Sequence, residues 1–398
     1  MRDAILVLNA GSSSLKFSLF RGANGDSELR SVFEGQVEGI GQQTARLVVT
    51  DATRKRRSAE SLPAAEAGDH RAAIARVRAW LRDHGAVEGL GAVGHRVVHG
   101  GDAFVAPVVL DPRVVAALRG LTDLAPLHQP PALDAIDAIT AALPDVPAVA
   151  CFDTAFHATL PAAASTYALP STWRALGLRR YGFHGLSHAW TSRRALELSD
   201  GRATRVVTCH LGGGASLAAV DGGRCVDTTM GFTPLDGLVM ATRSGSVDPG
   251  AVLWLQQHQG LSADAVADGL EHTSGLMGLC GTSDMREITA RAASGEATAT
   301  TALAVYVHRL RTAIAAMTAS LGGLDALVFS GGVGERSAPV RAAACAGLGF
   351  LGVDVDGTSN RDARGDERIS PPGAAVLVLV IEAREDLEIA AGVRRVLG

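Results

Sequence analysis

The first twenty residues combine two apolar patterns around a short polar segment. Residues 5–8 form a continuous apolar run, and Leu15, Phe17 and Leu19 then alternate with polar residues. A period of two predicts a strand with one buried face. The Gly/Ser segment at residues 11–14 is therefore predicted to join two strands. A Walker phosphate loop instead joins a strand to a helix and ends in Gly-Lys-Ser/Thr, so the pattern excludes a P-loop NTPase.

The same strand–loop–strand pattern recurs in the second half of the chain. Residues 206–208 are rich in apolar side chains, Gly212, Gly213 and Gly214 follow, and residues 216–220 resume as a strand. Two such units suggest duplicated domains. Only this element visibly repeats in the sequence, so the duplication is an inference.

Two segments have helical periodicity. Asp69 is predicted to cap a helix that places Ile74, Val77 and Leu81 on one face and ends near Gly85. Residues 301–321 give the clearest helix, which ends at Gly322. Its apolar positions recur at steps of three and four, and they are Val307, Leu310, Ile314, Met317 and Leu321.

Strands and helices alternate toward the C-terminus. Residues 326–329 are predicted to form a strand, 331–334 a glycine-rich turn and 338–345 a helix. A strand of residues 375–381 and a helix of residues 385–396 follow. This alternation predicts an α/β fold. The glycine-rich turn either contacts a nucleotide or is a tight turn without a ligand.

Composition narrows the class of protein. The 398 residues predict two to three domains, with 47% hydrophobic and 20% charged residues arguing against disorder. A net charge of −4 and only 4% aromatic residues argue against nucleic-acid binding and base stacking. The apolar runs are too short for a membrane span or a signal peptide, which predicts a soluble, cytoplasmic protein. The cysteines form no C-x-x-C pair and are interpreted as buried, reduced side chains: Cys151, Cys209, Cys225, Cys280 and Cys345.

Several segments carry groups that suit anions. The segment from Asn9 to Lys16 combines glycine, serine hydroxyls and one of only two lysines, so it either contacts phosphate or is an ordinary hairpin. Arg96 lies in a stretch of apolar residues and glycines, where a buried guanidinium needs an anionic ligand or a structural ion pair. Asp153 and Glu385 each follow a predicted strand, where an acid binds a metal or caps a helix.

Taken together, these segments resemble the acetate kinase family. The matching residues are 9–16, 94–101, 153–156, 181–188, 242–245 and 248–250, in order and over nearly the whole chain. The resemblance implies an α/β, two-domain actin-like ATPase (ribonuclease H-like) fold with duplicated sheet cores that close over a nucleotide. It implies an N-terminal domain of residues 1–150, completed by a C-terminal helix of residues 385–398. Residues 151–384 would form the second domain and carry most of the nucleotide site.

The reaction implied by the resemblance is reversible, direct in-line transfer of the ATP γ-phosphoryl group to acetate, giving acetyl phosphate and ADP. The implied metal is Mg²⁺, for which Mn²⁺ can substitute, and the implied assembly is a homodimer in the cytoplasm. No nucleic acid or membrane partner is expected.

The resemblance also assigns roles to single residues. Arg96 and Arg243 would grip the acyl carboxylate and the transferring phosphoryl group, His184 would steady the transition state with support from His128, and Asp153 would act in catalysis. Asn9 and Glu385 would place the metal. The pocket for the methyl group would comprise Val98, Leu127, Phe183 and Pro234 beside Arg96. The nucleotide would contact Ser12, Ser14, Lys16, His210, Gly212, Gly213, Gly214, Asp284, Met285, Arg286, Gly332, Val333, Gly334 and Arg336.

The chain departs from the family pattern mainly toward the nucleotide. The family usually has asparagine where Gly213, Arg336 and Gln129 stand, threonine where Leu186 stands, and Thr-Asn-Glu-Glu at residues 383–386. Alternatives are therefore a propionate or butyrate kinase, a carboxylate kinase with a phosphoryl donor other than ATP, and a non-catalytic ATPase module like actin or Hsp70. A non-catalytic module would leave Arg96, Arg243 and His184 unexplained.

Overall fold

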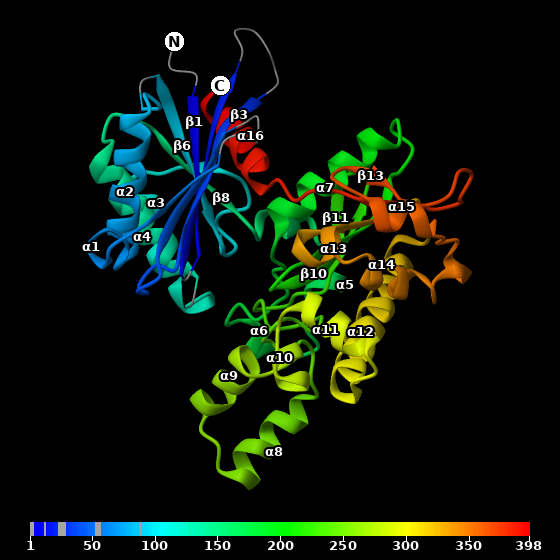
Figure 1. Cartoon of the computed structure of the whole chain (residues 1–398). Helices are drawn as coiled ribbons and strands as arrows, with labels where there is room; N and C mark the ends of the chain where they lie inside the picture. Colours follow the sequence, from blue (N-terminus) through cyan, green and yellow to red (C-terminus); the bar gives the residue numbers. More distant parts are fainter. Residues whose placement is uncertain (1–3, 12, 23–28, 52–56, 88, 127) are drawn as a thin grey trace. The chain divides into compact units, whose positions relative to one another are not determined.

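The computed structural model describes residues 4–11, 13–22, 29–51, 57–87, 89–126 and 128–398. The chain divides into two compact units (Figure 1). The first unit comprises Met1–Phe156 together with Arg384–Gly398, and the second comprises His157–Ala383. Each unit is built around its own sheet and is described by itself.

The sheet of the first unit has the strand order β5-β4-β3-β2-β1-β6-β8-β7. Strands β1 and β2 form an antiparallel hairpin, whereas β1, β6 and β8 run parallel. The two strands predicted around the Gly/Ser segment are confirmed. The strands are β1 (Ala4–Ala10), β2 (Ser14–Gly22), β3 (Leu29–Glu38), β4 (Arg46–Asp51), β5 (Arg57–Ser61), β6 (Leu90–Val97), β7 (Val108–Val109) and β8 (Ala148–Phe152).

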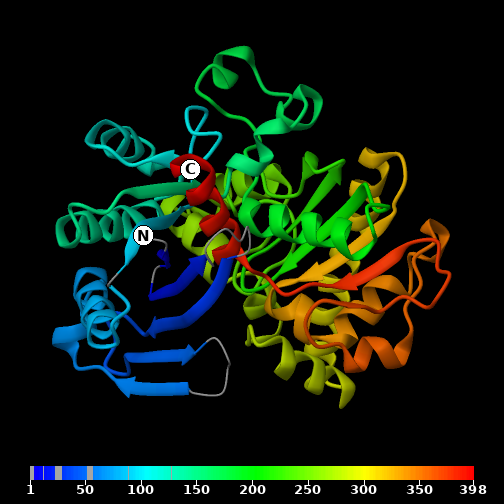
Figure 2. The same cartoon turned by 90° about the horizontal axis from the view of Figure 1, so that it is seen from above.

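Helices cover both faces of this sheet, which is why β1 is a continuous apolar run. Leu6 and Leu8 share a core cluster with Ile74. On the other face, a Cβ on Gly94 would lie 2.6 Å from Ile389 Cγ2. The last helix of the chain, α16, therefore packs directly on the sheet of the first unit (Figures 1 and 2). The helices are α1 (Ala64–Ala67), α2 (His70–Asp83), α3 (Pro112–Arg119), η1 (Thr122–Leu124), α4 (Gln129–Ala142) and α16 (Glu385–Leu397).

The sheet of the second unit has the order β11-β10-β9-β12-β14-β13. It repeats the pattern β3-β2-β1-β6-β8-β7 of the first: antiparallel strands, then parallel ones, then an antiparallel edge strand. The duplication inferred from one loop thus extends over six strands in each unit. The strands are β9 (Arg205–Leu211), β10 (Ala215–Asp221), β11 (Arg224–Thr228), β12 (Ala326–Ser330), β13 (Glu367–Arg368) and β14 (Leu377–Val380).

The predicted helices of both units are found. Asp69 caps α2, where its side chain accepts a hydrogen bond from the Ala72 N–H. The long helix α12 ends at Gly322, which adopts the left-handed conformation that glycine favours. The helices of the second unit are α5 (Ala162–Ser165), α6 (Ser171–Arg174), α7 (Gly185–Leu198), α8 (Pro249–Gln259), α9 (Ala263–His272), α10 (Gly275–Cys280), α11 (Met285–Ala293), α12 (Ala297–Leu321), α13 (Gly331–Arg336), α14 (Ala338–Cys345), η3 (Gly349–Leu351) and α15 (Gly357–Asp362), and η2 (Ala155–Thr159) spans the boundary between the units.

The glycine-rich turn predicted at residues 331–334 is wrong. This segment is helix α13, which begins directly after β12. Gly331 makes the whole change of direction by itself, with φ of 76°. A Cβ there would lie 2.7 Å from the carbonyl oxygen of Leu211, so only glycine fits. The Glu335 carboxylate then accepts a hydrogen bond from the Gly331 N–H at 3.0 Å, which stabilises the first turn.

All five cysteines are buried and none is in a disulfide, as expected from their spacing. Among the described residues, no helix combines the length and the apolar character that crossing a membrane requires.

Candidate active site

One cluster of polar side chains lies at an edge of the first unit's sheet. Asn9 is near the carboxyl end of β1, Arg96 near that of β6, and Asp153 directly follows β8. Because these strands are parallel, their carboxyl ends meet at the same edge. Glu385, the first residue of α16, joins them, and we call these four residues the arginine–carboxylate cluster.

Arg96 is the centre of this cluster. Its Nε donates to Asp153 Oδ1 at 3.0 Å and its Nη2 to Asp153 Oδ2 at 2.5 Å, a two-pronged ion pair. Its Nη1 donates to Asn9 Oδ1 at 3.1 Å. Asp153 is only 1% exposed, whereas the Arg96 side chain is 19% exposed. The structural ion pair left open by the sequence is thus present, and part of the guanidinium still reaches solvent.

Electrostatics keep Arg96 charged. Burial by itself would lower the pKa of its guanidinium, but the carboxylates of Asp153 and Glu385 outweigh burial and raise the pKa above its usual value. Glu385 Oε2 lies 3.9 Å from Arg96 Nε and accepts a hydrogen bond from Asn9 Nδ2 at 3.3 Å. Glu385 therefore points at the cluster, and the N-cap position of α16 belongs to Arg384.

Three other predicted residues of the first unit, Ser14, Lys16 and Val98, lie on β2 or directly after β6. Lys16 is exposed on β2, in register with Asn9 across the hairpin, and Ser14 begins that strand. Val98 is buried directly after β6. His128 is the N-cap residue of α4 and is half-buried. Ser12 and Leu127 lie outside the described residues.

Gln129, which stands where the family usually has asparagine, stabilises the fold of the first unit. It is fully buried at the start of α4. Its Oε1 accepts a hydrogen bond from the His99 N–H at 3.4 Å, and its Nε2 donates to the His99 carbonyl at 3.1 Å. These two bonds tie down the chain that follows Arg96 and Val98.

A second cluster lies in the second unit, where α7 covers the β9–β10 hairpin. His184, Ser187, His188 and Thr191 fall on one face of α7 because they are three and four positions apart. His184 has φ of 56°, a left-handed conformation that non-glycine residues seldom adopt. Such strain costs about 1–3 kcal/mol and is found preferentially at functional positions.

The loop of Gly212, Gly213 and Gly214 faces this helix. A Cβ on Gly214 would lie 3.3 Å from His184 Nε2 and 3.7 Å from Arg243 Nη1. His184 and Arg243 therefore approach the same point of the loop, although they are 59 positions apart in the sequence. A Cβ on Gly213, by contrast, would have no described atom within 4 Å, so packing alone does not require glycine there.

Arg243 is oriented by a residue that the sequence reasoning missed. Its Nε donates to Glu271 Oε2 at 2.8 Å, and the two side chains are 19% and 21% exposed. Thr242 Oγ1 donates to the backbone carbonyl of Glu271 at 2.9 Å. This second hydrogen bond keeps the segment of Arg243 next to Glu271. Glu271 lies in α9, and no local pattern in the sequence marks it.

Histidines behind His184 are buried and neutral. His157 Nε2 donates to the Phe183 carbonyl at 2.9 Å, and burial lowers the pKa of His157 to about 4. The pKa of His188 lies well below its usual value, first through burial and then through His157 and His210. Arg243 supplies a fixed positive charge beside Gly214.

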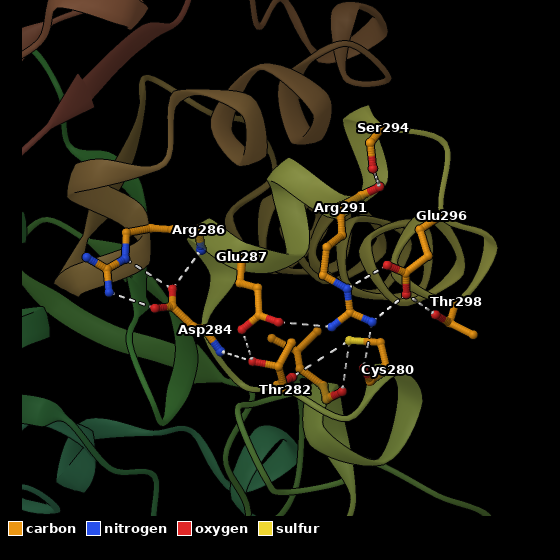
Figure 3. A network of polar contacts seen from close by, with 10 residues as sticks. Cys280, Thr282, Asp284, Arg286, Glu287, Arg291, Ser294, Glu296 and Thr298 are labelled. Carbon is orange, nitrogen blue, oxygen red and sulfur yellow. Dashed lines mark hydrogen bonds and ion pairs between the residues drawn. The ribbon is translucent and has the colours of Figure 1, made fainter.

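The predicted nucleotide residues lie on further elements of the second unit. Asp284 caps α11 by accepting from the Arg286 N–H at 2.9 Å, and it pairs with the Arg286 side chain (Figure 3). These hydrogen bonds from Arg286 lower the pKa of Asp284 to about 2. Met285 is buried next to them. His210 is half-buried at the end of β9, and its Nδ1 lies 2.8 Å from Ser187 Oγ.

Gly332, Val333, Gly334 and Arg336 all belong to α13. Gly332 is exposed, Arg336 lies at the exposed end of the helix and Gly334 is buried. Of the predicted methyl pocket, Phe183 is buried and Pro234 half-buried in the second unit, whereas Val98 belongs to the first.

Comparison with known proteins gives a consistent result. The model of the acetokinase family matches residues 4–391. Acetate kinases of Synechococcus sp. and Streptomyces coelicolor are each 47% identical, over 99% and 97% of this chain and 99% and 95% of their own length. A propionate kinase structure from Francisella tularensis has a TM-score of 0.91 at 34% identity, covering 99% of this chain and 100% of its own. The Porphyromonas gingivalis acetate kinase structure has a TM-score of 0.89 at 37% identity, with both chains fully covered.

The chain therefore belongs to the acetokinase family. Members of this family are phosphotransferases that act on a carboxyl group, and the family's reaction is the ATP-dependent phosphorylation of acetate. The predicted fold class, an α/β two-domain actin-like fold, is confirmed.

The buried neutral histidines predict how stability depends on pH. His157 has a pKa of about 4 in the folded protein against a usual value of 6.5, so below pH 6.5 the unfolded chain binds a proton that the folded chain does not. Stability should therefore fall as the pH decreases from about 6.5 to about 4, by up to about 3 kcal/mol for this residue. Urea unfolding between pH 6.5 and pH 4 measures the free energy of unfolding.

His157→Gln should flatten that dependence, because glutamine does not titrate. His308→Gln is the control, since His308 is exposed on α12. Equal slopes for wild type and His157→Gln would contradict the prediction.

Proposed function

We propose that this protein catalyses reversible, Mg²⁺-dependent transfer of the ATP γ-phosphoryl group to acetate, giving acetyl phosphate and ADP. The observation that carries the proposal is the approach of His184 and Arg243 to one point of the Gly212–Gly214 loop. Backbone N–H groups of a glycine loop, an arginine and a histidine together suit a transferring phosphoryl group.

The chemistry explains why the candidate site is rich in arginine. Acetate is already ionised at neutral pH, so the reaction needs no strong base. The difficulty is to bring one anion onto another. Fixed cations that face the equatorial oxygens of the in-line transition state lower this barrier. Arginine's planar fork matches both carboxylate and phosphate.

Each unit contributes one part of this chemistry. In the first unit, Arg96 binds the acyl carboxylate, and Asp153 holds its guanidinium in place through two hydrogen bonds. In the second unit, Arg243 and His184 bind the transferring phosphoryl group, with Glu271 orienting Arg243. His128 supports the transition state. Val98 and Leu127 of the first unit and Phe183 and Pro234 of the second are proposed to contact the methyl group.

The nucleotide is bound through two sets of residues. Its phosphates contact Ser12, Ser14 and Lys16 together with His210 and the Gly212–Gly214 loop. Its adenosine moiety contacts residues 284–286 and residues 332–336. We further propose that the two units are the two actin-like domains, the second carrying most of the nucleotide site.

The residues of the first cluster fit a magnesium ion. Asn9 Oδ1 and the Glu385 carboxylate are hard oxygen donors that lie within one hydrogen-bonded cluster. Among the described residues there is no group of three or more His, Cys, Asp or Glu side chains that could hold a metal. Mg²⁺ suits such a site, because it usually keeps several waters and binds substrate phosphates beside one or two carboxylates. When bound, the ion, or Mn²⁺ in its place, neutralises charge on the phosphates.

The competing functions are separated by one assay. Hydroxylamine trapping measures acyl phosphate from acetate, propionate or butyrate with ATP, GTP or pyrophosphate as donor. We expect acetate with ATP to be the best pair, although one methylene discriminates by only about 1–3 kcal/mol. A non-catalytic ATPase module would hydrolyse ATP without forming any acyl phosphate, and that outcome would refute the proposal.

Substitutions of Arg243 and Arg96 should have different effects. Arg243→Ala should lower kcat by about 10³-fold or more, because a cation on the transferring phosphoryl group is lost. At Arg96 alanine would leave the buried Asp153 carboxylate unpaired, at a cost of about 3–5 kcal/mol. Arg96→Lys instead keeps the charge and loses the fork, so it should raise the KM for acetate and lower kcat.

Arg202→Ala is the control for both, because Arg202 is 77% exposed beside Asp200. Steady-state kinetics on folded protein, checked by circular dichroism, measure all three variants. Kinetics like those of Arg202→Ala in either site variant would contradict the assigned role.

Arg336 is proposed to alter contacts with the base or ribose. It lies at the end of α13, two positions after Gly334. Arg336→Asn should therefore change the relative kcat/KM for ATP and GTP while leaving the KM for acetate unchanged. The same donor preference in wild type and variant would rule this out.

We also propose that the protein is a cytoplasmic homodimer. Helix α8 supports this assembly, because it has no buried residue and exposes Leu253 (53%) and Trp254 (50%). Exposed apolar side chains grouped on one helix are typical of protein interfaces. Light scattering should give twice the mass of the chain for wild type and the mass of one chain for Trp254→Glu. A monomeric wild type would contradict the proposal.

A further inference from the structure

A row of imidazole and hydroxyl groups runs from His184 into the interior of the second unit. His184 Nδ1 lies 2.9 Å from Ser216 Oγ, and Ser216 Oγ lies 2.8 Å from His188 Nε2. His188 Nδ1 lies 2.7 Å from Thr208 Oγ1. Ser216, His188 and Thr208 are each at most 1% exposed. We call these three residues the buried relay, and the chemistry proposed above does not use them.

The fold explains why these groups meet. Thr208 and His210 are two positions apart on β9, so they face the same side of the sheet. Ser216 is in register with His210 on the neighbouring strand β10, and it faces that side too. Helix α7 covers this side, with His184 and His188 one turn apart.

The direction of each hydrogen bond follows from the far end of the row. Thr208 Oγ1 also lies 3.4 Å from the carbonyl oxygen of Ala218, which can only accept. When Thr208 donates its hydroxyl proton to that carbonyl, it accepts from His188 Nδ1–H at 2.7 Å, and this is the arrangement on which the inference rests. His188 is neutral and carries one ring proton, because burial holds its pKa well below the usual value.

The remaining protons are then determined. Since the proton of His188 is on Nδ1, its Nε2 accepts the hydroxyl proton of Ser216. Ser216 Oγ in turn accepts from Nδ1–H of His184. The ring of His184 is thereby held with its proton on Nδ1, and Nε2 is the nitrogen that gains or loses a proton.

We propose that Ser216, His188 and Thr208 are positioning residues that hold His184 in the Nδ1–H tautomer, so that Nε2 is the protonating nitrogen beside Gly214. The inference rests on the proposed function, in which His184 faces the transferring phosphoryl group. Nε2 donates to a phosphoryl oxygen only when it carries the additional proton, and the imidazolium then adds positive charge to that of Arg243.

The groups that face His184 are on the helix, the hairpin and the arginine segment. His210 lies beside it with ring centroids 4.4 Å apart, and its own Nδ1 is bonded to Ser187. Arg243 approaches from the loop side, paired with Glu271. His188 lies beyond Ser216. His184 Nε2 therefore faces Gly214 and the Arg243 guanidinium, while Nδ1 faces the buried relay.

Thr208→Val tests the relay with little change in shape. Without the threonine hydroxyl, His188 Nδ1–H has no acceptor at that position, so its proton should move to Nε2. Ser216 would then donate to His184 Nδ1, and the His184 proton would move to Nε2. The ¹⁵N chemical shifts of the histidine-labelled full chain report this exchange directly, with His184→Gln identifying the resonances of His184.

We expect the Nδ1–H tautomer of His184 in wild type and the Nε2–H tautomer in Thr208→Val. We also expect kcat at neutral pH to fall about tenfold in Thr208→Val with the KM for acetate and ATP unchanged. That factor corresponds to about 1.4 kcal/mol of transition-state stabilisation.

Thr228→Val is the matched control. Thr228 is equally buried on the other strand beside β10, and its hydroxyl donates to the Leu217 carbonyl at 2.7 Å, outside the relay. It should keep the wild-type tautomer and kcat. An Nε2–H tautomer in wild type, or a Thr208→Val protein that matches Thr228→Val, would overturn the inference. A wild type that forms no acyl phosphate would instead refute the proposed function, while the tautomer still decides on the relay.

Discussion

The buried ion pair between Arg96 and Asp153 is the constraint on which the first unit's part of the site depends. A carboxylate that is 1% exposed is tolerated only with a cation held against it. The pair joins β6 to the end of β8, and Asn9 and Glu385 join it from β1 and α16. Four segments, of which β1 and α16 lie at opposite ends of the chain, are therefore fixed around one guanidinium, part of which still reaches solvent.

In the second unit, the buried titratable groups beside the candidate site are neutral rather than paired ions. Its buried histidines avoid the cost of buried charge by staying unprotonated, and each one contacts a hydroxyl, thiol or carbonyl. Positive charge beside the glycine loop is supplied by Arg243, held by Glu271. His184 reaches the same point of the loop from a strained backbone position. A rigid neutral interior thus carries the two groups that we propose to act on phosphate.

The two sheets share one topology but carry different groups. Each has a hairpin followed by parallel strands, and in each a glycine-containing loop connects the hairpin. The first unit places Asn9, Arg96 and Asp153 at the ends of its parallel strands, while the second packs α7 over its hairpin. The same topology therefore presents an acyl-binding arginine in one unit and a phosphoryl-binding pair in the other, under the proposed function.

The sequence by itself predicted several of the elements and the family. A continuous apolar run located β1, a period-two pattern located β2, and helical patterns located α2 and α12, because such patterns depend on neighbouring residues alone. The long motifs indicated the family, and the comparisons confirm it. The roles of single residues, such as Arg96, His184 and Arg243, remain proposals.

Only the tertiary structure decided which distant segments contact one another. Glu271 on Arg243, Gln129 on His99, and the row from His184 to Thr208 leave no local period in the sequence. Residues 331–334 became a helix for the same reason, since the carbonyl of Leu211 and the Glu335 side chain shape the start of α13.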